Sequence, residues 1–299
     1  MTLAATTPDT APILAAAPHQ VAWRHLSGDA SFWIGGGILL AIAAVALIGP
    51  WFTLDPTLQN LGHRLADPIW RPRGTWQYPL GTDQLGRDVL ARLVEGARIS
   101  LFIGFSTILM SGLIGTTLGM LAGYFGGKVD LVINFLITIR LTLPVVLVAL
   151  VVVAVIGSSL TVLIAVIGLL LWDRFAVVTR SATQRLAGSD FITAARCTGS
   201  STLRILVLEL LPNIVGPLVV VATVEIAHAV LLEAALSFLG LGVKPPLASW
   251  GLMVSEAKNQ ILFRPWTIAI PGVALVTLIL GINLLGDALR DAISPEGRT

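Results

Sequence analysis

The sequence predicts an all-α membrane protein with six transmembrane helices, and two observations predict it. Of the 299 residues, 55% are hydrophobic and 12% are charged, whereas ordinary soluble domains have about 45–50% and about 25%. The apolar residues also fall into six blocks, each near the roughly 20 residues that a helix needs to cross a bilayer. The net charge of +2 gives no sign of a nucleic-acid partner, and the single Cys197 excludes an intrachain disulfide and a cysteine-rich metal site.

The first two blocks, residues 32–52 and 99–122, carry no charge. Trp33 and Trp51 lie near the two ends of the first block, where amphipathic rings favour the membrane surface. Small residues recur at every fourth position along the second block: Ser111, Gly115, Gly119 and Gly123. A stripe of this kind lets another helix approach closely, which predicts a packing contact.

The other four blocks are also interpreted as one membrane-spanning helix each. The third, residues 131–156, contains Arg140, and a tight turn at residues 157–159 separates it from the fourth, which runs from Leu160 to Trp172 and a little beyond. The fifth covers residues 213–236 and the sixth covers residues 266–285. An even number of spans places both termini on the same side. Lys and Arg are almost equally frequent on the two faces, so their distribution does not fix which side is cytoplasmic.

Four parts follow from these blocks: an N-terminal tail (1–31), the first helix with its connecting segment (32–97), a core of five helices (98–293) and a C-terminal tail (294–299). The first part contains a short apolar stretch with no basic flank before it, which is not typical of a cleaved signal peptide. Two connecting segments are too long to be turns and fall on opposite faces of the membrane: residues 55–97 and residues 173–212.

The connecting segment 173–212 is rich in arginine and contains the signals of a short helix. Ser189 or Asp190 is suited to cap its start, and Gly199 is suited to the left-handed conformation that ends a helix. Three residues share one face by their spacing: Phe191, Ala194 and Ala195. This small apolar patch beside basic residues suits docking into a groove of a partner. An amphipathic helix lying on the bilayer surface is the alternative.

Three ionisable residues lie inside the fifth block: Glu225, His228 and Glu233. A charge at mid-membrane costs roughly 2.5–3.5 kcal/mol on the insertion scale, so such residues normally face a partner or a wet cavity. For Glu225 and His228 two interpretations stay open, a place on a translocation path and interhelical hydrogen bonding near a subunit interface. Glu233 lies near the end of the block, which suggests a role in gating the path or a place at a subunit interface.

Several segments resemble one family of membrane proteins. Residues 190–199, DFITAARCTG, with the later Glu209 and Pro212, resemble the "EAA" loop of ABC-importer permeases. Residues 231–251, LLEAALSFLGLGVKPPLASWG, resemble more specifically the C-type permease subunit of dipeptide, oligopeptide and nickel importers. Three further segments match the same subfamily: residues 81–88, 122–130 and 283–291. All the matching segments occur in the same order as in the subfamily and extend from about residue 79 to residue 295.

This resemblance implies a type I ABC importer permease fold in a bacterial-type inner membrane. Both termini and residues 173–212 would be cytoplasmic, and residues 55–97 would be external. The implied partners are a homologous second permease subunit, two ABC ATPase subunits, an extracytoplasmic substrate-binding protein and the lipid bilayer. ATP and Mg²⁺ would bind to the ATPase subunits, and this chain would hold no cofactor, no metal and no catalytic residue. It would form half of a path for dipeptides, oligopeptides or a related small solute, by alternating access.

The resemblance also assigns ATPase coupling to an EAA loop at about residues 180–212. The residues implied are Phe191, Thr193, Ala194, Ala195, Arg196, Gly199 and Pro212. Thr193 and Glu209 depart from the family pattern, which has Glu and His at these places. The departures leave the helix, its glycine and its small face intact.

Two other function classes fit the sequence less well than a permease. An autonomous secondary transporter or channel would need no long basic loop of this kind. An intramembrane enzyme would need a nucleophile with its base, or a metal set, at membrane depth, and His228 is the only histidine in the six blocks. A phosphate-binding loop is also excluded, because Ala122 and Val129 stand where it needs Gly and Ser or Thr.

Overall fold

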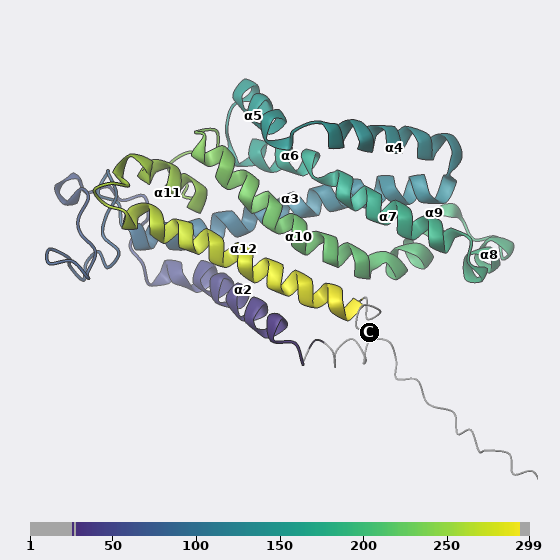
Figure 1. The fold of residues 1–299 in the computed structure, drawn as a ribbon, viewed down its shortest axis with the longest axis horizontal. Coiled ribbons are helices and arrows are strands. Elements are labelled where there is room, and N and C mark those ends of the chain that lie inside the picture. Colours follow the sequence, from purple (N-terminus) through teal and green to yellow (C-terminus); the bar gives the residue numbers. More distant parts are fainter. Residues whose placement is uncertain (1–25, 27, 294–299) are drawn as a thin grey trace, which may run out of the picture.

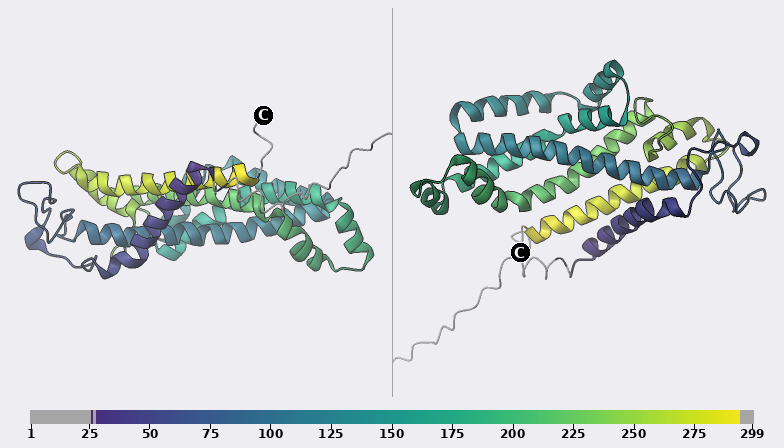
Figure 2. Two further views of the ribbon diagram at one scale, coloured as in Figure 1. Left: turned by 90° about the horizontal axis from the view of Figure 1, so that it is seen from below. Right: turned by 180° about the vertical axis from the view of Figure 1, so that it is seen from behind.

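The computed structural model describes residue 26 and residues 28–293. The predicted C-terminal tail (294–299) and nearly all of the predicted N-terminal tail (1–31) lie outside the described residues. Within them, all regular secondary structure is helical apart from one isolated bridge between Thr82 and Asp88. Long helices run side by side along one axis, with the extended segment 52–88 at one end and α8 (Asp190–Cys197) at the other (Figures 1 and 2). We call residues 52–88 the strap.

The prediction of an all-α membrane protein is confirmed. Among the described residues, five helices are long and apolar enough to cross a membrane, and a bent pair supplies a sixth span if it is counted as one. The first span begins with α2 (Ala30–Ile48), which is capped by the Asp29 carboxylate through the N–H of Ser31 at 2.8 Å. A 3₁₀ turn over Gly49–Trp51 ends it.

The second span is longer than predicted, because α3 runs from Val89 to Phe125. The Asp88 carboxylate caps its start by accepting hydrogen bonds from the N–H groups of Leu90 and Ala91, at 3.1 and 3.2 Å. Residues 89–97, which were predicted to belong to a connecting segment, are therefore helical.

The small-residue stripe of α3 packs against α7 (Trp172–Ala187), which confirms the predicted packing contact. A Cβ added at any of its three glycines would lie under 3.0 Å from a backbone oxygen of α7. The pairs are Gly115 with Trp172, Gly119 with Ala176, and Gly123 with Arg180. Side chains here would force the two backbones apart, so the glycines set the distance between the helices.

The prediction of a single helix over residues 131–156 is wrong. The chain forms α4 (Gly127–Thr142) and α5 (Val145–Ile156), which are bent by 87° at the break between them. Pro144 lacks an N–H and disfavours helical backbone at the residue before it, and Leu143 accordingly has an extended ψ of 128°.

The fourth span also continues beyond its predicted end. α6 (Leu160–Leu170) and α7 form one span from Leu160 to Ala187, with a short break at Leu171. The turn before it is as predicted: Gly157 has a φ of 101°, and the Ser159 hydroxyl caps α6 by accepting from the N–H of Val162 at 3.2 Å.

The fifth span starts earlier than predicted. α9 (Thr202–Arg204), a π-helical turn over Ile205–Leu210 and α10 (Leu211–Phe238) together form one span. The predicted connecting segment 173–212 is therefore mostly helical, and only residues 188–201 with α8 lie between two spans.

The last part of the chain contains α11 (Trp250–Ala257), a 3₁₀ turn over Lys258–Gln260 and α12 (Trp266–Ile293). α12 contacts α2, α10 and α11. The main apolar core lies among α3, α6 and α10 and includes four side chains that are 0% exposed: Ile103, Leu163, Ile167 and Leu236.

Candidate functional site

The short helix α8 forms where the sequence predicts it and is held by a residue that the prediction did not single out. Ile192 is 0% exposed and packs into an apolar cluster with Met120 of α3 and residues of the π turn. The sequence pattern concealed this anchor because Ile192 lies next to Phe191, and nothing local shows which of the two apolar side chains is buried.

The predicted docking face of α8 is partly open. Phe191 is 41% exposed and Ala194 is exposed, whereas Ala195 is half-buried against the cluster around Ile192. The Thr193 hydroxyl is exposed and donates to the Ser189 carbonyl at 3.1 Å. Apolar side chains thus remain on the outer side of a helix that is fixed from its inner side.

The remaining predicted coupling residues make local contacts. The Arg196 guanidinium lies over the Tyr124 ring at 4.8 Å from its centroid, and its Nε donates to the Tyr124 hydroxyl at 3.3 Å. Gly199 has a φ of 79°, as predicted for the residue that ends the helix. Pro212 lies in the first turn of α10, directly after the π turn.

The two carboxylates predicted in the fifth block have different surroundings. Glu233 is 1% exposed, and its Oε1 accepts from the hydroxyls of Ser237 at 2.6 Å and Ser249 at 2.8 Å. Because Ser249 caps α11, Glu233 fixes that helix to α10. Glu225 is also 1% exposed, but its Oε1 pairs with Nε of Arg174 and with Nδ1 of His228, each at 3.2 Å.

A second ion pair lies beside the first. Arg140 Nη2 is 3.8 Å from Asp173 Oδ1, and Arg140 Nε donates to the Leu170 carbonyl at the break between α6 and α7. We call the five charged or ionisable residues the Glu225 cluster: Arg140, Asp173, Arg174, Glu225 and His228. The sequence located Arg140, Glu225 and His228 in the spans but gave no sign that they meet.

Two cavities flank the Glu225 cluster, with volumes of about 420 and 460 Å³. They share four lining residues, of which three belong to the cluster: Leu141, Asp173, Arg174 and Glu225. The Arg174 side chain is 56% exposed, and Glu225 Oε2 has no hydrogen-bond partner among the described residues. A buried acid beside a largely exposed arginine therefore lies between two membrane spans, Leu160–Ala187 and Thr202–Phe238.

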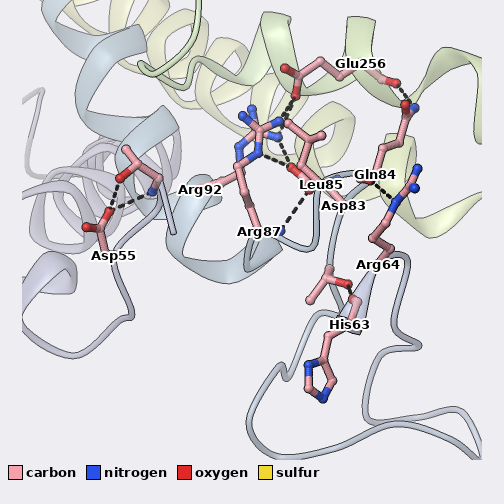
Figure 3. Close-up of polar contacts among 11 residues, drawn as sticks. Asp55, His63, Arg64, Asp83, Gln84, Leu85, Arg87, Arg92 and Glu256 are labelled. Carbon is pink, nitrogen blue, oxygen red and sulfur yellow. Dashed lines mark hydrogen bonds and ion pairs between the residues drawn. The ribbon is translucent and has the colours of Figure 1, made fainter. Parts of the chain in front are cut away.

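Another charged cluster lies at the strap end, and the sequence did not predict it (Figure 3). Asp83 Oδ2 pairs with Arg87 at 2.7 Å and with Arg92 at 2.6 Å, and both guanidinium groups also pair with Glu256 of α11, at 3.0 and 2.6 Å. We call these four residues the strap cluster.

Nearby, burial raises the pKa of the Asp88 carboxyl, and its two backbone hydrogen bonds oppose the rise.

Comparison with known proteins identifies the class. Residues 115–298 match the family of the binding-protein-dependent transport system inner membrane component. The chain belongs to this family, so it is a multi-pass inner membrane protein and a transport subunit, not a catalytic enzyme. Residues 18–68 match the N-terminal transmembrane domain of oligopeptide transport permease C, which places it among the C-type permeases.

Individual relatives cover almost the whole chain. The dipeptide transport system permease protein DppC of Haemophilus influenzae is 38% identical over 93% of this chain and 95% of its own length. The di/tripeptide transport system permease protein DppC of Pseudomonas aeruginosa is 40% identical over 87% of each chain. A chain from inward-facing structures of the MetNI methionine ABC transporter matches with a TM-score of 0.54 at 20% identity, over 67% of this chain and 96% of that one, which shows a shared fold.

Proposed function

We propose that this chain forms half of the translocation path of an ATP-driven peptide importer. Support comes from the relatives, which are named as dipeptide and di/tripeptide permeases and are covered almost end to end. The other half of the path would come from a homologous permease subunit. Two ABC ATPase subunits would bind ATP and Mg²⁺, and an extracytoplasmic binding protein would deliver the peptide.

In this proposal α8 and both termini face the cytoplasm, and the strap faces outward. The observation that carries it is α8 itself, a two-turn helix beyond the ends of two spans, with Phe191 and Ala194 exposed and Ile192 anchored below. Small exposed side chains let a partner approach closely, and the buried anchor makes the helix move with α3 and the π turn. This arrangement suits a contact that transmits force from an ATPase.

The Glu225 cluster is proposed to line the path. Ionisable groups at membrane depth normally face a wet cavity or a partner, because lipid cannot solvate them. Here Arg174 is more than half exposed beside two cavities, and Glu225 lies directly behind it.

Reconstitution tests the function and the coupling helix together. The chain, its second permease, the two ATPases and the binding protein are assembled in proteoliposomes, and ATP-driven uptake of alanyl-alanine is measured. Ala194→Arg should reduce uptake more than tenfold, because it places a bulky charge on the docking face, while Gln184→Arg on exposed α7 surface serves as the control. Equal uptake by the two variants would contradict coupling through α8. Uptake without ATP would instead support an autonomous transporter or channel.

The path assignment has its own test. The double variant Glu225→Gln, His228→Gln removes two of the three ionisable groups of α10, leaves Glu233 in place and keeps hydrogen-bonding capacity at both positions. We expect altered preference among charged and neutral dipeptides and a severalfold lower uptake rate in the same proteoliposomes. Unchanged rate and preference would mean that the pair only joins helices.

A further inference from the structure

The Glu225 cluster presents nitrogen groups to its surroundings and keeps its acids covered. The side chain of Arg174 is 56% exposed and that of His228 is 42% exposed. The side chains of Asp173 and Glu225 are 5% and 1% exposed. A solute that reaches this cluster therefore meets a guanidinium and an imidazole before it can meet a carboxylate.

Most of the donors on the Arg174 guanidinium are unused. The closest contact to Glu225 is made by Nε, at 3.2 Å from Oε1, and the two Nη groups donate no hydrogen bond within the described part of the chain. Arg174 belongs to the span Leu160–Ala187, where a charged group without polar partners is costly. An arginine fork matches a carboxylate through two parallel N–H···O bonds, so an incoming carboxylate would satisfy these donors.

The two cavities beside the cluster differ in their remaining lining. The cavity of about 420 Å³ also reaches Asp287 and Arg290 of α12, which are both exposed and opposite in charge. The cavity of about 460 Å³ is lined by apolar residues outside the cluster, among them Val145 of α5 and Leu231 of α10. Its volume lies within the range of small-molecule sites. This second cavity therefore suits a ligand with an anionic end and an apolar side chain.

The net charge of the Glu225 cluster decides which form of ligand fits. Its two carboxylates are matched by two guanidinium groups, through the ion pairs Arg140–Asp173 and Arg174–Glu225. A dipeptide carries one ammonium and one carboxylate, so the bound zwitterion would leave the region without net charge. Its carboxylate is the end that an open guanidinium attracts, because the acids that would attract the ammonium are covered.

We propose that Arg174 binds the C-terminal carboxylate of the peptide in transit, while the C-terminal side chain lies along the apolar wall that α5 and α10 give to the cavity of about 460 Å³. The proposal deepens the proposed function and rests on it, since there the Glu225 cluster lines the path. Arg174 then determines specificity for peptides with a free carboxyl end. Glu225 is a positioning residue that holds the guanidinium from its buried side.

The test compares the binding of alanyl-leucine and alanyl-leucinamide, which lacks the carboxylate. Both permeases and both ATPases are assembled in nanodiscs without nucleotide or binding protein, and each Kd is obtained by saturation-transfer NMR. The wild type should bind alanyl-leucine at least fivefold more tightly than the amide. Arg174→Gln should abolish this preference, and Arg174→Lys, which keeps the charge but not the fork, should retain part of it. Arg185→Gln makes the same change at an exposed arginine of α7 and should keep the full preference.

Three results would overturn the carboxylate site. The first is equal affinity of the wild type for the two ligands, a comparison that needs no variant. The second is a preference that survives in Arg174→Gln, because the carboxylate would then be recognised elsewhere. The third is loss of co-purification of the two permeases in Arg174→Gln but not in Arg174→Lys, which would pair this guanidinium with an acid of the second permease.

The proposed function is judged separately, by ATP-driven uptake of alanyl-leucine into wild-type proteoliposomes that contain the binding protein. Uptake by the wild type without any carboxylate preference would leave the proposed function standing and remove only the Arg174 site. Absence of uptake by the wild type would contradict the proposed function itself.

Discussion

The two ends of this molecule are stabilised by different kinds of interaction. At the strap end, buried ion pairs join the start of α3 to α11, and Arg87 and Glu256 are 169 residues apart in the chain. At the α8 end, the short helix is attached by the apolar side chain of Ile192 and by the stacking of Arg196 on Tyr124. The strap end is fixed mainly by ion pairs between side chains that are largely buried, and the α8 end mainly by one buried apolar side chain with a single exposed arginine–tyrosine contact.

This difference suits the two proposed tasks. Ion pairs between nearly buried groups lose much of their energy when the geometry changes, so the strap end resists distortion. Apolar packing depends on buried area rather than on bond angle, so α8 stays attached to α3 and the π turn when they move together. In the proposed function, peptide is delivered to the strap end from outside and the ATPases act on α8 from inside. A rigid strap end and an α8 that moves with its anchor suit these two tasks.

The largest effect is expected at the strap end. Arg92→Ala would leave Asp83 and Glu256 without half of their countercharge, and loss of one partner from a buried ion pair costs about 3–5 kcal/mol. The thermal midpoint of the purified assembly should fall by several degrees. Arg98→Ala, which removes an exposed arginine from the same helix, is the control and should leave the midpoint almost unchanged. Equal midpoints would show that the ion pairs do not brace this end.

A smaller and local effect is expected at α8. Ile192→Ala should destabilise the attachment of the helix by about 2–5 kcal/mol, the usual cost of truncating a buried isoleucine, because the other residues of its cluster are themselves buried. Amide hydrogen exchange of residues 190–199 should accelerate while exchange in α3 stays the same. Ile192→Val removes one methylene and should have a minor effect. A lower thermal midpoint without local exchange would contradict the picture of a separately attached helix.

The sequence predicts best where the determining interactions are local. The end of α8 at Gly199 follows from a glycine within a few residues, whereas the predicted side-chain cap is absent: Ser189 occupies the N-cap position, but its hydroxyl donates to the Leu186 carbonyl at 2.6 Å. The extent of α3 was missed because Arg92, Glu95 and Arg98 interrupt the apolar pattern, and the burial of Arg92 depends on Glu256 far along the chain. No local pattern encodes such a contact.

The candidate site shows the same limit. Glu225 and His228 could be identified because an ionisable residue inside an apolar block is recognisable from the sequence alone. Arg174, the partner of Glu225, could not be identified, because it lay outside the predicted boundary of its own span, and its position depends on how α7 packs beside α10. The break at Pro144 was available from the sequence, since proline disfavours a helical residue before it, and was missed in a strongly apolar run.

The close packing of α3 against α7 has a mechanical consequence. Because Gly119 and Gly123 leave no gap between the two backbones, neither helix can slide or bend without the other. α8 follows α7 after two residues, and from Ala187 back to Arg174 a helix rises about 20 Å at 1.5 Å per residue. The pair therefore acts as a stiff lever, so that a push on α8 would reach the ion pairs at the centre of the membrane as a displacement rather than be absorbed along the way.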